Sequence, residues 1–120
     1  MTPEDAIDAV FQAWQALDVE RLVALFTDDA RYEDPLFPAP LVGRDQMREG
    51  IAPAMADLAD CSIHSVRSVA GDEVAMVEAE FRSTLAGERG RLDFDFAMVV
   101  ELRDGRIARL AEYFDTRPLA

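Results

Sequence analysis

Apolar residues recur every three or four positions in the first part of the chain: Ile7, Val10, Phe11, Trp14 and Leu17. This spacing predicts an amphipathic helix with one buried stripe. Residues 2–5 read Thr-Pro-Glu-Asp, which supplies an N-cap, a proline in the first turn and two acids near the positive end of the helix. We expect the stripe to pack in the core, and its Trp14 end could also form the wall of a ligand cavity.

Two further helices are predicted before residue 60. Asp18 can cap the first of them and Asp45 can cap the second. Their inward positions would be Leu22, Leu25 and Phe26 in the first, and Met47, Ile51, Met55 and Leu58 in the second. Gly50 and Pro53 weaken the second of these helices, so we expect a kink or a break there.

The second half of the chain changes to strand-like segments that are separated by turn signals. They cover residues 63–69, 74–85, 91–102 and 107–115, and Asp104-Gly105 is a sharp hairpin signal before the last one. Helices followed by a four-stranded antiparallel meander indicate an α+β fold with the helices on one face of the sheet. A curved sheet wrapped on a long helix leaves a conical pocket suited to an apolar ligand. We therefore predict a single domain over residues 1–120.

A short strand between the helices carries two polar side chains to the mouth of this pocket. After a turn at Asp28-Asp29, Tyr32 and Asp34 share one face of the strand because they are two residues apart. Pro35 then ends the strand, since proline has no N–H to donate to a ladder. Simpler roles compete with catalysis here, because Tyr32 could only pack and Asp34 could be an ordinary turn residue before proline.

The loop at residues 35–43 is rich in both proline and apolar residues. Three prolines within six residues exclude regular structure and stiffen the chain. Its apolar members are Leu36, Phe37 and Leu41. The loop is predicted to form a lid or rim of the cavity, with simple packing on the core as the alternative.

The last two strands indicate which side chains point inward. The even positions of the segment 91–102 are all apolar: Leu92, Phe94, Phe96, Met98, Val100 and Leu102. In the last strand, Glu112 interrupts a face that is otherwise formed by Ala108, Leu110 and Phe114. Burying an ionised carboxylate costs several kcal/mol, so Glu112 is predicted to be a pocket acid with a raised pKa. The alternative is an exposed Glu112, with residues 107, 109, 111 and 113 packed instead.

Two other titratable residues are weaker candidates. In the segment 74–85 the buried positions would be Ala75, Val77, Ala79, Phe81 and Leu85. That alternation turns Glu78 and Glu80 outward unless a bulge reverses part of the strand. His64 alternates with Val66 on a mixed strand and can be either a structural or a catalytic histidine.

Composition narrows the chemistry that this chain can perform. The net charge is −12, from 24 acidic and 12 basic residues, and every basic residue is an arginine. Such a balance argues against binding to nucleic acid or to anionic membranes. The absence of lysine excludes Schiff-base chemistry and a P-loop. No segment resembles a membrane helix or a signal peptide, so we expect a cytoplasmic protein.

Metal and cofactor sites are not expected either. The single cysteine, Cys61, excludes an intrachain disulfide and a thiolate zinc site, and we expect it to be a small buried residue. His64 is the only histidine, whereas most transition-metal sites use several imidazoles or thiolates. Any catalysis would depend on carboxylates, phenols, arginine and His64, which suits proton transfer or activation of water.

The arrangement of these segments resembles the nuclear-transport-factor-2-like superfamily. The matching features are the two opening helices, the strand that ends in Asp34-Pro35, the run Gly43-Arg44-Asp45, and a closing hairpin at residues 104–107 that leads to Glu-Tyr-Phe-Asp at 112–115. The resemblance implies the cystatin-like α+β barrel of SnoaL polyketide cyclases, ketosteroid isomerases and limonene epoxide hydrolases. This fold hosts many chemistries, so it does not by itself select the reaction.

The resemblance also suggests roles for individual residues. Asp34 falls where ketosteroid isomerases keep the general base, while Val10 and Met98 occupy the positions of that family's oxyanion donors. Against limonene epoxide hydrolases, Tyr32 matches a water-orienting tyrosine and Glu112 stands at one catalytic aspartate. Against SnoaL cyclases, Asp34, Glu112 or Asp115 could be the single pocket acid or base.

These observations lead to one main hypothesis and two alternatives. The main hypothesis is an enzyme without a cofactor that isomerises or cyclises a polyketide-, steroid- or terpenoid-like molecule. Asp34 would be the base, Glu112 a second proton-transfer group and Tyr32 an orienting donor. The substrate would contact Trp14, Phe37, Met55, Phe96, Met98, Leu110 and Phe114. The alternatives are an epoxide hydrolase and a non-catalytic module for ligand binding or dimerisation, and by family analogy we expect a homodimer through the outer face of the sheet.

Overall fold

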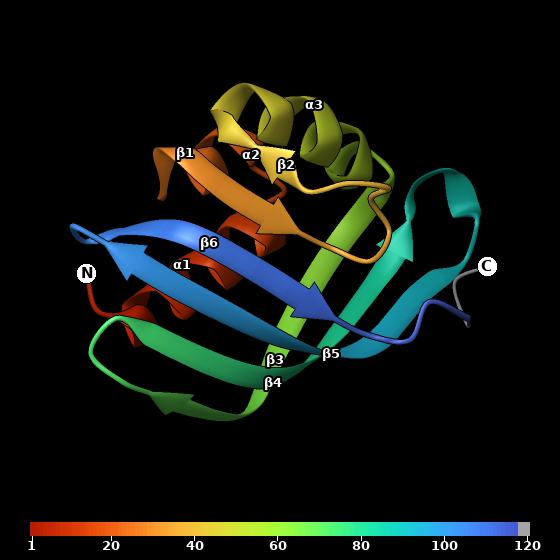
Figure 1. Ribbon diagram of the computed structural model, residues 1–120. Helices are drawn as coiled ribbons and strands as arrows, with labels where there is room; N and C mark the ends of the chain where they lie inside the picture. The colour runs from red at the N-terminus through yellow and green to blue at the C-terminus, as the bar shows by residue number, and fades with distance from the viewer. Residues whose placement is uncertain (118–120) are drawn as a thin grey trace.

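The computed structural model describes residues 1–117, which form three helices and one curved six-stranded sheet (Figure 1). Helix α1 (Pro3–Gln15) begins where the sequence predicts. Thr2 Oγ1 accepts a hydrogen bond from the Asp5 N–H at 3.1 Å, and Asp5 Oδ2 accepts one from the Thr2 N–H at 3.2 Å. This reciprocal capping box satisfies two backbone donors that the helix itself leaves unpaired. Asp18 caps the short helix α2 (Val19–Val23), as expected.

Helix α3 (Gly43–Ala56) differs from the prediction in two ways. Its N-cap is Val42 and not Asp45, and the Val42 N–H donates to Gln46 Oε1 at 2.9 Å. The helix also continues through Gly50 and Pro53, so the expected break is absent from it. Its buried residues Met47, Ile51 and Met55 anchor it on the core and offset the weak positions.

Gly50 has a packing reason that the sequence alone does not reveal. A Cβ atom at this position would lie 2.8 Å from Leu41 Cδ1. Leu41 belongs to the short strand β2 (Leu41–Val42), and the end of its side chain packs over the helix at Gly50. The glycine that weakens the helix therefore leaves room for the Leu41 side chain.

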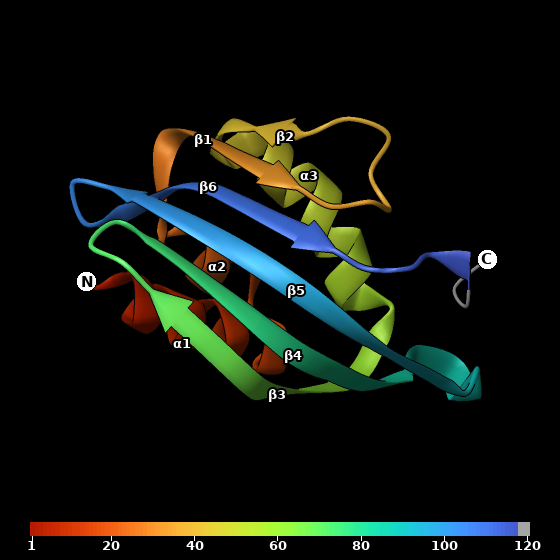
Figure 2. The same ribbon diagram turned by 60° about the horizontal axis from the view of Figure 1, so that its bottom comes forward.

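The sheet has the strand order β2-β1-β6-β5-β4-β3. Its main strands are β1 (Phe26–Glu33), β3 (Leu58–Ala70), β4 (Val74–Leu85), β5 (Arg91–Arg103) and β6 (Arg106–Tyr113). All neighbours are antiparallel except β1 and β6, which pair in parallel. Figure 2 shows the three helices behind this sheet, so they cover one face and leave the other free. The predicted α+β architecture, with helices on one face of a curved sheet, is confirmed.

Two strands are longer or more regular than the sequence suggested. Strand β3 begins at Leu58, which was expected at the end of α3, and it already contains the buried Cys61. Strand β1 begins at Phe26, so Asp28 and Asp29 lie within the strand and the predicted turn there is wrong. The β1–β6 pairing shifts register between Phe26 and Arg31, which accommodates the polar pair without a reversal of the chain.

An irregularity in β6 changes the pattern of its inward face. Leu102 pairs with Ile107 and Glu101 pairs with Arg109, so Ala108 is one residue too many for its partner strand. This bulge places Ile107 in the core in place of Ala108. Beyond it, Leu110 lies in the core and Glu112 lines the cavity, as predicted, but Ala111 between them is buried as well.

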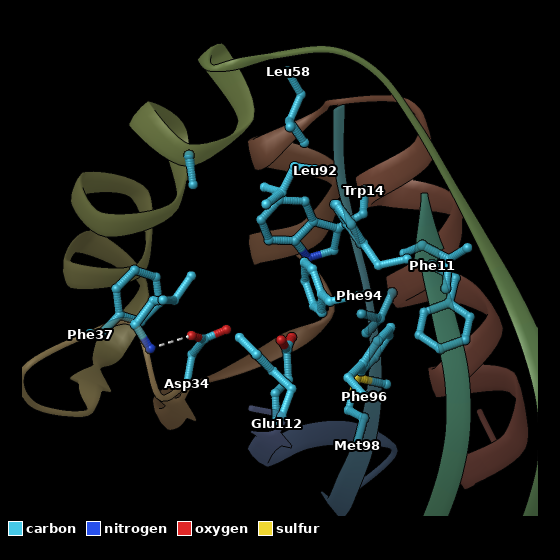
Figure 3. Close-up of a pocket in the computed structure, with 16 residues that line it drawn as sticks. Phe11, Trp14, Asp34, Phe37, Leu58, Leu92, Phe94, Phe96, Met98 and Glu112 are labelled. Carbon is cyan, nitrogen blue, oxygen red and sulfur yellow. Dashed lines mark hydrogen bonds between the residues drawn. The ribbon is translucent and has the colours of Figure 1, made fainter. Parts of the chain in front are cut away.

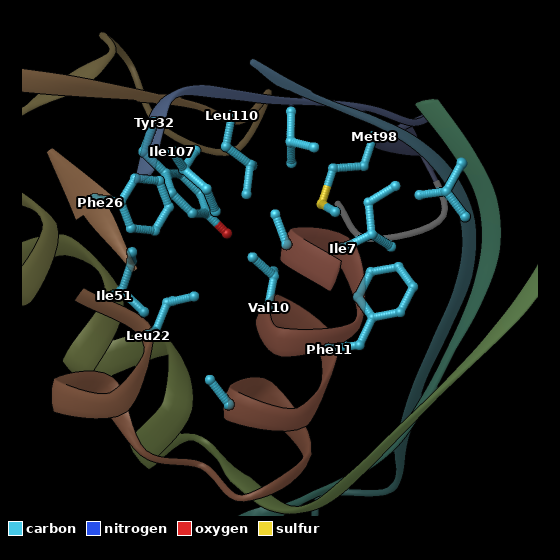
Figure 4. Close-up of a cluster of buried hydrophobic side chains, with 14 of the residues drawn as sticks. Ile7, Val10, Phe11, Leu22, Phe26, Tyr32, Ile51, Met98, Ile107 and Leu110 are labelled. Carbon is cyan, nitrogen blue, oxygen red and sulfur yellow. The ribbon is translucent and has the colours of Figure 1, made fainter. Parts of the chain in front are cut away.

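The core fills the space between the helices and the sheet (Figure 4). Its largest fully buried side chains are Tyr32, Phe26, Leu22, Met47, Ile51, Met98, Ile107 and Leu110. Every even residue of β5 from Phe96 to Leu102 is buried, and Leu92 and Phe94 are partly buried, as the alternation predicts. The core is continuous along α1 but opens into a cavity where Trp14 ends the apolar stripe.

Candidate active site

An apolar cavity lies between α1, the loop after β1 and the strands β4, β5 and β6 (Figure 3). Its volume is about 110 Å³. The lining residues are Val10, Phe11, Trp14, Asp34, Leu36, Phe37, Ala54, Leu58, Ile63, Phe81, Leu92, Phe94, Phe96, Met98, Glu112 and Phe114. Asp34 and Glu112 are the only ionisable residues of this lining, so the cavity has one polar end within an otherwise hydrophobic wall.

Phe94 is the centre of an aromatic wall on the sheet side. Its ring stacks on Phe81 with the centroids 4.7 Å apart, and it packs against Phe114 at 4.6 Å. Trp14 closes this wall from the helix side, with an edge contact to Phe81 at 6.4 Å. Such a wall would contact apolar parts of a ligand through large, rigid surfaces.

The polar end is built by the parallel pairing of β1 and β6. Tyr32 lies opposite Leu110 in this pairing, which brings Glu112, two residues further on, to the phenol. Tyr32 Oη donates a hydrogen bond to Glu112 Oε1 at 2.8 Å. Tyr32 is fully buried, so its ring is held by the core while its hydroxyl faces the carboxyl group.

Asp34 is held by the turn that follows β1. Its Oδ1 accepts the Leu36 N–H at 2.8 Å, and its backbone carbonyl accepts the Phe37 N–H at 3.0 Å. This turn aims the carboxyl group into the cavity beside Glu112 (Figure 3). The turn role and the pocket role of Asp34, which the sequence left as alternatives, therefore coexist in one residue.

The surroundings of Glu112 favour its neutral form. Burial raises the pKa of Glu112 well above its ordinary value, and the neighbouring carboxyl group of Asp34 raises it further. The hydrogen bond from Tyr32 acts in the opposite direction but is the smallest of these effects. Burial and the nearby carboxyl groups also raise the pKa of Tyr32, so its phenol stays protonated. The cavity thus holds a carboxylic acid and a second carboxyl group side by side.

Trp14 adds a third polar group that the sequence analysis did not anticipate. Its Nε1–H is the one buried side-chain polar group without a hydrogen-bond partner among residues 1–117. The donor is near the Tyr32 hydroxyl and lowers the pKa of that phenol slightly, but the two groups do not meet hydrogen-bond geometry. Nothing in a helical stripe of apolar residues shows where an indole nitrogen will point.

The predicted substrate contacts divide into two groups. Trp14, Phe37, Phe96, Met98 and Phe114 line the cavity. Met55 and Leu110 are instead core residues with 4 % and 0 % of their surface exposed, and neither is part of the lining. Phe94 also lines the cavity but was not among the predicted contacts, although it shares the inward face of its strand with Phe96 and Met98.

The three weaker candidates lie outside the cavity. His64 is exposed on β3, opposite Glu80 on β4. Glu80 faces outward, and its Oε2 lies 3.2 Å from the Arg82 guanidinium. Asp115 is exposed and paired with Arg117 at 2.6 Å. Glu78 also faces outward, so no bulge turns either glutamate of β4 into the cavity.

A surface hollow of about 510 Å³ meets the polar end from outside. Asp34, Glu112 and Phe114 belong to its lining as well as to that of the cavity. Arg109 stands in this hollow, with its guanidinium 2.8 Å from Glu33 and 3.0 Å from Glu101. The two carboxyl groups therefore lie between a hydrophobic interior and a charged, open surface.

Residues 1–117 lack two other kinds of feature, a cluster of metal ligands and a membrane-spanning helix. No group of three or more His, Cys, Asp or Glu side chains in this part of the chain is arranged to hold a metal ion. None of the helices there has the length and apolar character needed to cross a bilayer.

Comparison with solved structures confirms the fold that the sequence resembles. The epoxide hydrolase/cyclase-like enzyme SalBIII, described in pyran ring formation of the polyether salinomycin, is 22 % identical with a TM-score of 0.81, over 94 % of this chain and 90 % of that one. A putative polyketide cyclase from Xanthomonas campestris pv. campestris is 16 % identical with a TM-score of 0.81, over 98 % and 93 %. An epoxide hydrolase from M. tuberculosis that resembles limonene epoxide hydrolase is 23 % identical with a TM-score of 0.77, over 93 % and 81 %.

These identities are low enough that the likeness establishes the fold and not the reaction. No curated protein matches the sequence. The profile of one protein family, the SnoaL-like domain, matches residues 7–110. That match covers most of the 120 residues, and the chain therefore belongs to the SnoaL-like domain family.

Proposed function

We propose that this protein catalyses proton transfer within a small hydrophobic molecule that carries an oxygen, leading to isomerisation or cyclisation. The observation that carries the proposal is the pair of carboxyl groups, Asp34 and Glu112, at the single polar end of an apolar cavity. Asp34 acts as the base and removes a proton from carbon next to a carbonyl group. Glu112 acts as the acid and donates its proton to the carbonyl oxygen as negative charge develops there.

The electrostatics of the pair support this division of roles. Two carboxyl groups side by side in one apolar site favour a state in which one of them keeps its proton. Glu112, whose pKa is raised by burial and by the charge of Asp34, is the member that keeps its proton. Tyr32 donates to Glu112 Oε1 and so orients the acid, which leaves Glu112 Oε2 for the exchange of its proton.

The size of the cavity bears on the substrate. A volume of about 110 Å³ is smaller than the roughly 300–1,000 Å³ of pockets that hold drug-sized ligands. A polyketide-, steroid- or terpenoid-like substrate would therefore displace the segment of Leu36 and Phe37 that closes one side of the cavity. The open surface hollow beside this segment provides the space into which a longer substrate would extend.

A second candidate function is the opening of an epoxide. The same pair would serve it, with Glu112 giving its proton to the epoxide oxygen while Asp34 takes one from water or from a substrate hydroxyl group. The Tyr32–Glu112 hydrogen bond favours this candidate because it orients an acid inside an apolar site. Two similar structures, SalBIII and the M. tuberculosis epoxide hydrolase, carry the name of this reaction class.

Two further proposals concern the setting of the enzyme. The outer face of β3 and β4 exposes Val66, Val69, Val74 and Met76, which supports pairing of two copies through this face. The acidic charge of the chain is consistent with a cytoplasmic protein that avoids nucleic acid and anionic membranes.

Mass spectrometry in ¹⁸O-labelled water tests the function directly. The protein is incubated with unconjugated enones, polyketide-like ketones and terpene epoxides, beside the variants Asp34→Asn and Glu112→Gln. A product of unchanged mass whose formation requires Asp34 supports isomerisation or cyclisation. A product heavier by one labelled water supports epoxide hydrolysis. If no substrate turns over, the proposal is contradicted and a non-catalytic binding module becomes the better explanation.

A further inference from the structure

The indole nitrogen of Trp14 is an unused hydrogen-bond donor within the cavity. Its atom is buried, and no acceptor among residues 1–117 is placed to receive its hydrogen. Buried polar groups in folded proteins are almost always paired, so an orphan donor points to a partner that is bound only in function. The cavity next to it is the space in which such a partner would lie.

The direction of the indole supports this interpretation. Figure 3 shows the nitrogen turned toward the side of the cavity that holds Glu112. The same nitrogen is close to the Tyr32 hydroxyl, which itself donates to Glu112. The Tyr32 hydroxyl already donates its hydrogen to Glu112. The polar groups available to bind a ligand are therefore the Trp14 N–H and the carboxyl groups of Asp34 and Glu112.

The rest of the wall sets the kind of partner. Apart from Asp34, Glu112 and the indole nitrogen, the lining side chains are hydrocarbon or thioether, with Phe94, Phe96 and Met98 on the sheet side. A ligand that satisfies the indole must therefore be apolar over most of its surface and carry one hydrogen-bond acceptor near Glu112.

We propose that the Trp14 Nε1–H donates a hydrogen bond to an acceptor oxygen of the substrate, so that the cavity selects ketones and ethers over hydrocarbons of the same shape. This inference rests on the proposed function only in that it takes the cavity as the substrate site. Trp14 thereby fixes which end of the substrate faces the carboxyl pair, and it acts as a specificity-determining residue.

Nuclear magnetic resonance tests the contact in the unmodified chain. Trp14 is the single tryptophan of the protein, so a ¹⁵N-labelled sample gives one indole N–H signal. The probes are cyclohexanone and methylenecyclohexane, which have the same shape but differ in the acceptor oxygen. Binding of the ketone should move the indole proton downfield, whereas the hydrocarbon should bind without that downfield change.

Variants then measure what the donor contributes. Trp14→Phe keeps an aromatic wall but removes the N–H, and it should weaken binding of the ketone by roughly 2- to 12-fold, the range of one net hydrogen bond. Binding of methylenecyclohexane should change by less than that. Phe96→Leu is the matched control, because it alters the wall without removing a donor and should affect both probes alike.

Several outcomes would overturn the proposal. They are an indole signal that stays in place while the ketone binds, an equal loss of both probes in Trp14→Phe, and no binding of the ketone at all. The first measurement needs no variant, so it decides the question even where Trp14→Phe fails to fold.

The test also separates this inference from the proposed function. Binding through Trp14 can be observed whether or not any compound turns over. Ketone binding with the expected indole shift but without Asp34-dependent turnover would leave the inference standing and contradict the catalytic proposal. Turnover that requires Asp34, with no response of the indole, would do the reverse.

Discussion

Glu112 and Glu80 belong to the same sheet and project from opposite faces of it. Glu80 faces outward, retains 39 % of its side-chain exposure and lies beside the Arg82 guanidinium. Glu112 faces the cavity, is hydrogen-bonded by a buried phenol, and has a second carboxyl group next to it. Exposed ion pairs of the first kind contribute little to stability, whereas a carboxyl group of the second kind has its protonation controlled by the fold. The same type of side chain thus becomes a surface charge or a pocket acid according to the face of the sheet to which it belongs.

The largest effect is expected when one carboxylate is removed from the cavity and, in a separate variant, one from the exposed surface. If the inward pair performs the chemistry, Asp34→Asn should lower kcat by about 10²- to 10⁴-fold, the range for loss of a general base. Asp115→Asn makes the same chemical change in an exposed ion pair with Arg117 and should leave kcat unchanged. Steady-state kinetics with the substrate identified by mass spectrometry measure kcat for both variants. Equal losses in the two variants would show that the inward position confers no special role.

The pH dependence of stability tests whether the folded protein keeps Glu112 protonated. Its pKa is raised in the folded protein, so the folded state holds the proton more tightly than the unfolded chain does. The stabilisation is complete below the ordinary pKa of about 4.5 and is lost as pH rises toward the folded value. Over that window this single group should lower the free energy of unfolding by up to about 1.4 kcal/mol per pH unit.

Urea titrations at a series of pH values measure this slope. In Glu112→Gln the contribution should disappear, so that the variant gains stability relative to the parent protein as pH rises. Glu80→Gln is the matched control for removal of one carboxylate from the outer face. An unaltered slope in Glu112→Gln would mean that the cavity does not hold Glu112 in its protonated form.

The smallest expected effect concerns the hydrogen bond that holds the acid. Tyr32→Phe removes the donor to Glu112 and should reduce the free energy of unfolding by about 1 kcal/mol. Because this hydrogen bond lowers the pKa of Glu112, the variant should also keep the acid protonated to higher pH. As a result, the alkaline limb of the profile of kcat against pH should move to higher pH.

Tyr113→Phe supplies the comparison for this change on the exposed side. The Tyr113 hydroxyl accepts a hydrogen bond from Arg109 at 3.3 Å, and Tyr113 lines the surface hollow but makes no contact with Glu112 through a hydrogen bond. Loss of this hydroxyl should change the free energy of unfolding by no more than a few tenths of a kcal/mol. It should move the pH profile of kcat by no more than a few tenths of a pH unit. A larger effect from Tyr113 than from Tyr32 would contradict the assignment of the orienting role.

Local sequence patterns predicted the scaffold well, because each pattern had a physical cause within a few residues. The alternation in β5 identified its buried face, the N-cap and first-turn residues predicted the start of α1, and Asp104-Gly105 marked the last hairpin. Errors occurred where a distant contact decided the outcome. The packing of Leu41 accounts for a glycine at position 50 within a continuous helix. The bulge at Ala108 places Ile107 in the core instead of Ala108.

The candidate site was predictable only in part. The inward positions of Tyr32, Asp34 and Glu112 followed from their strands. Their mutual arrangement did not, because the parallel pairing of β1 with β6 is not encoded near either strand. Met55 and Leu110 had the correct apolar character, but only the packing decides whether an inward residue reaches a cavity or fills the core. The direction of the Trp14 nitrogen required the same three-dimensional information.

The hydrogen bond between Tyr32 and Glu112 joins residues that are 80 positions apart. Closing a loop of this length costs chain entropy, which the folded structure must offset. The polar end of the cavity consequently cannot exist in a chain whose last strand has not yet docked beside β1. A chain in which β6 has not docked would lack both Glu112 and the Phe114 side of the wall, so the complete cavity exists only in the finished fold.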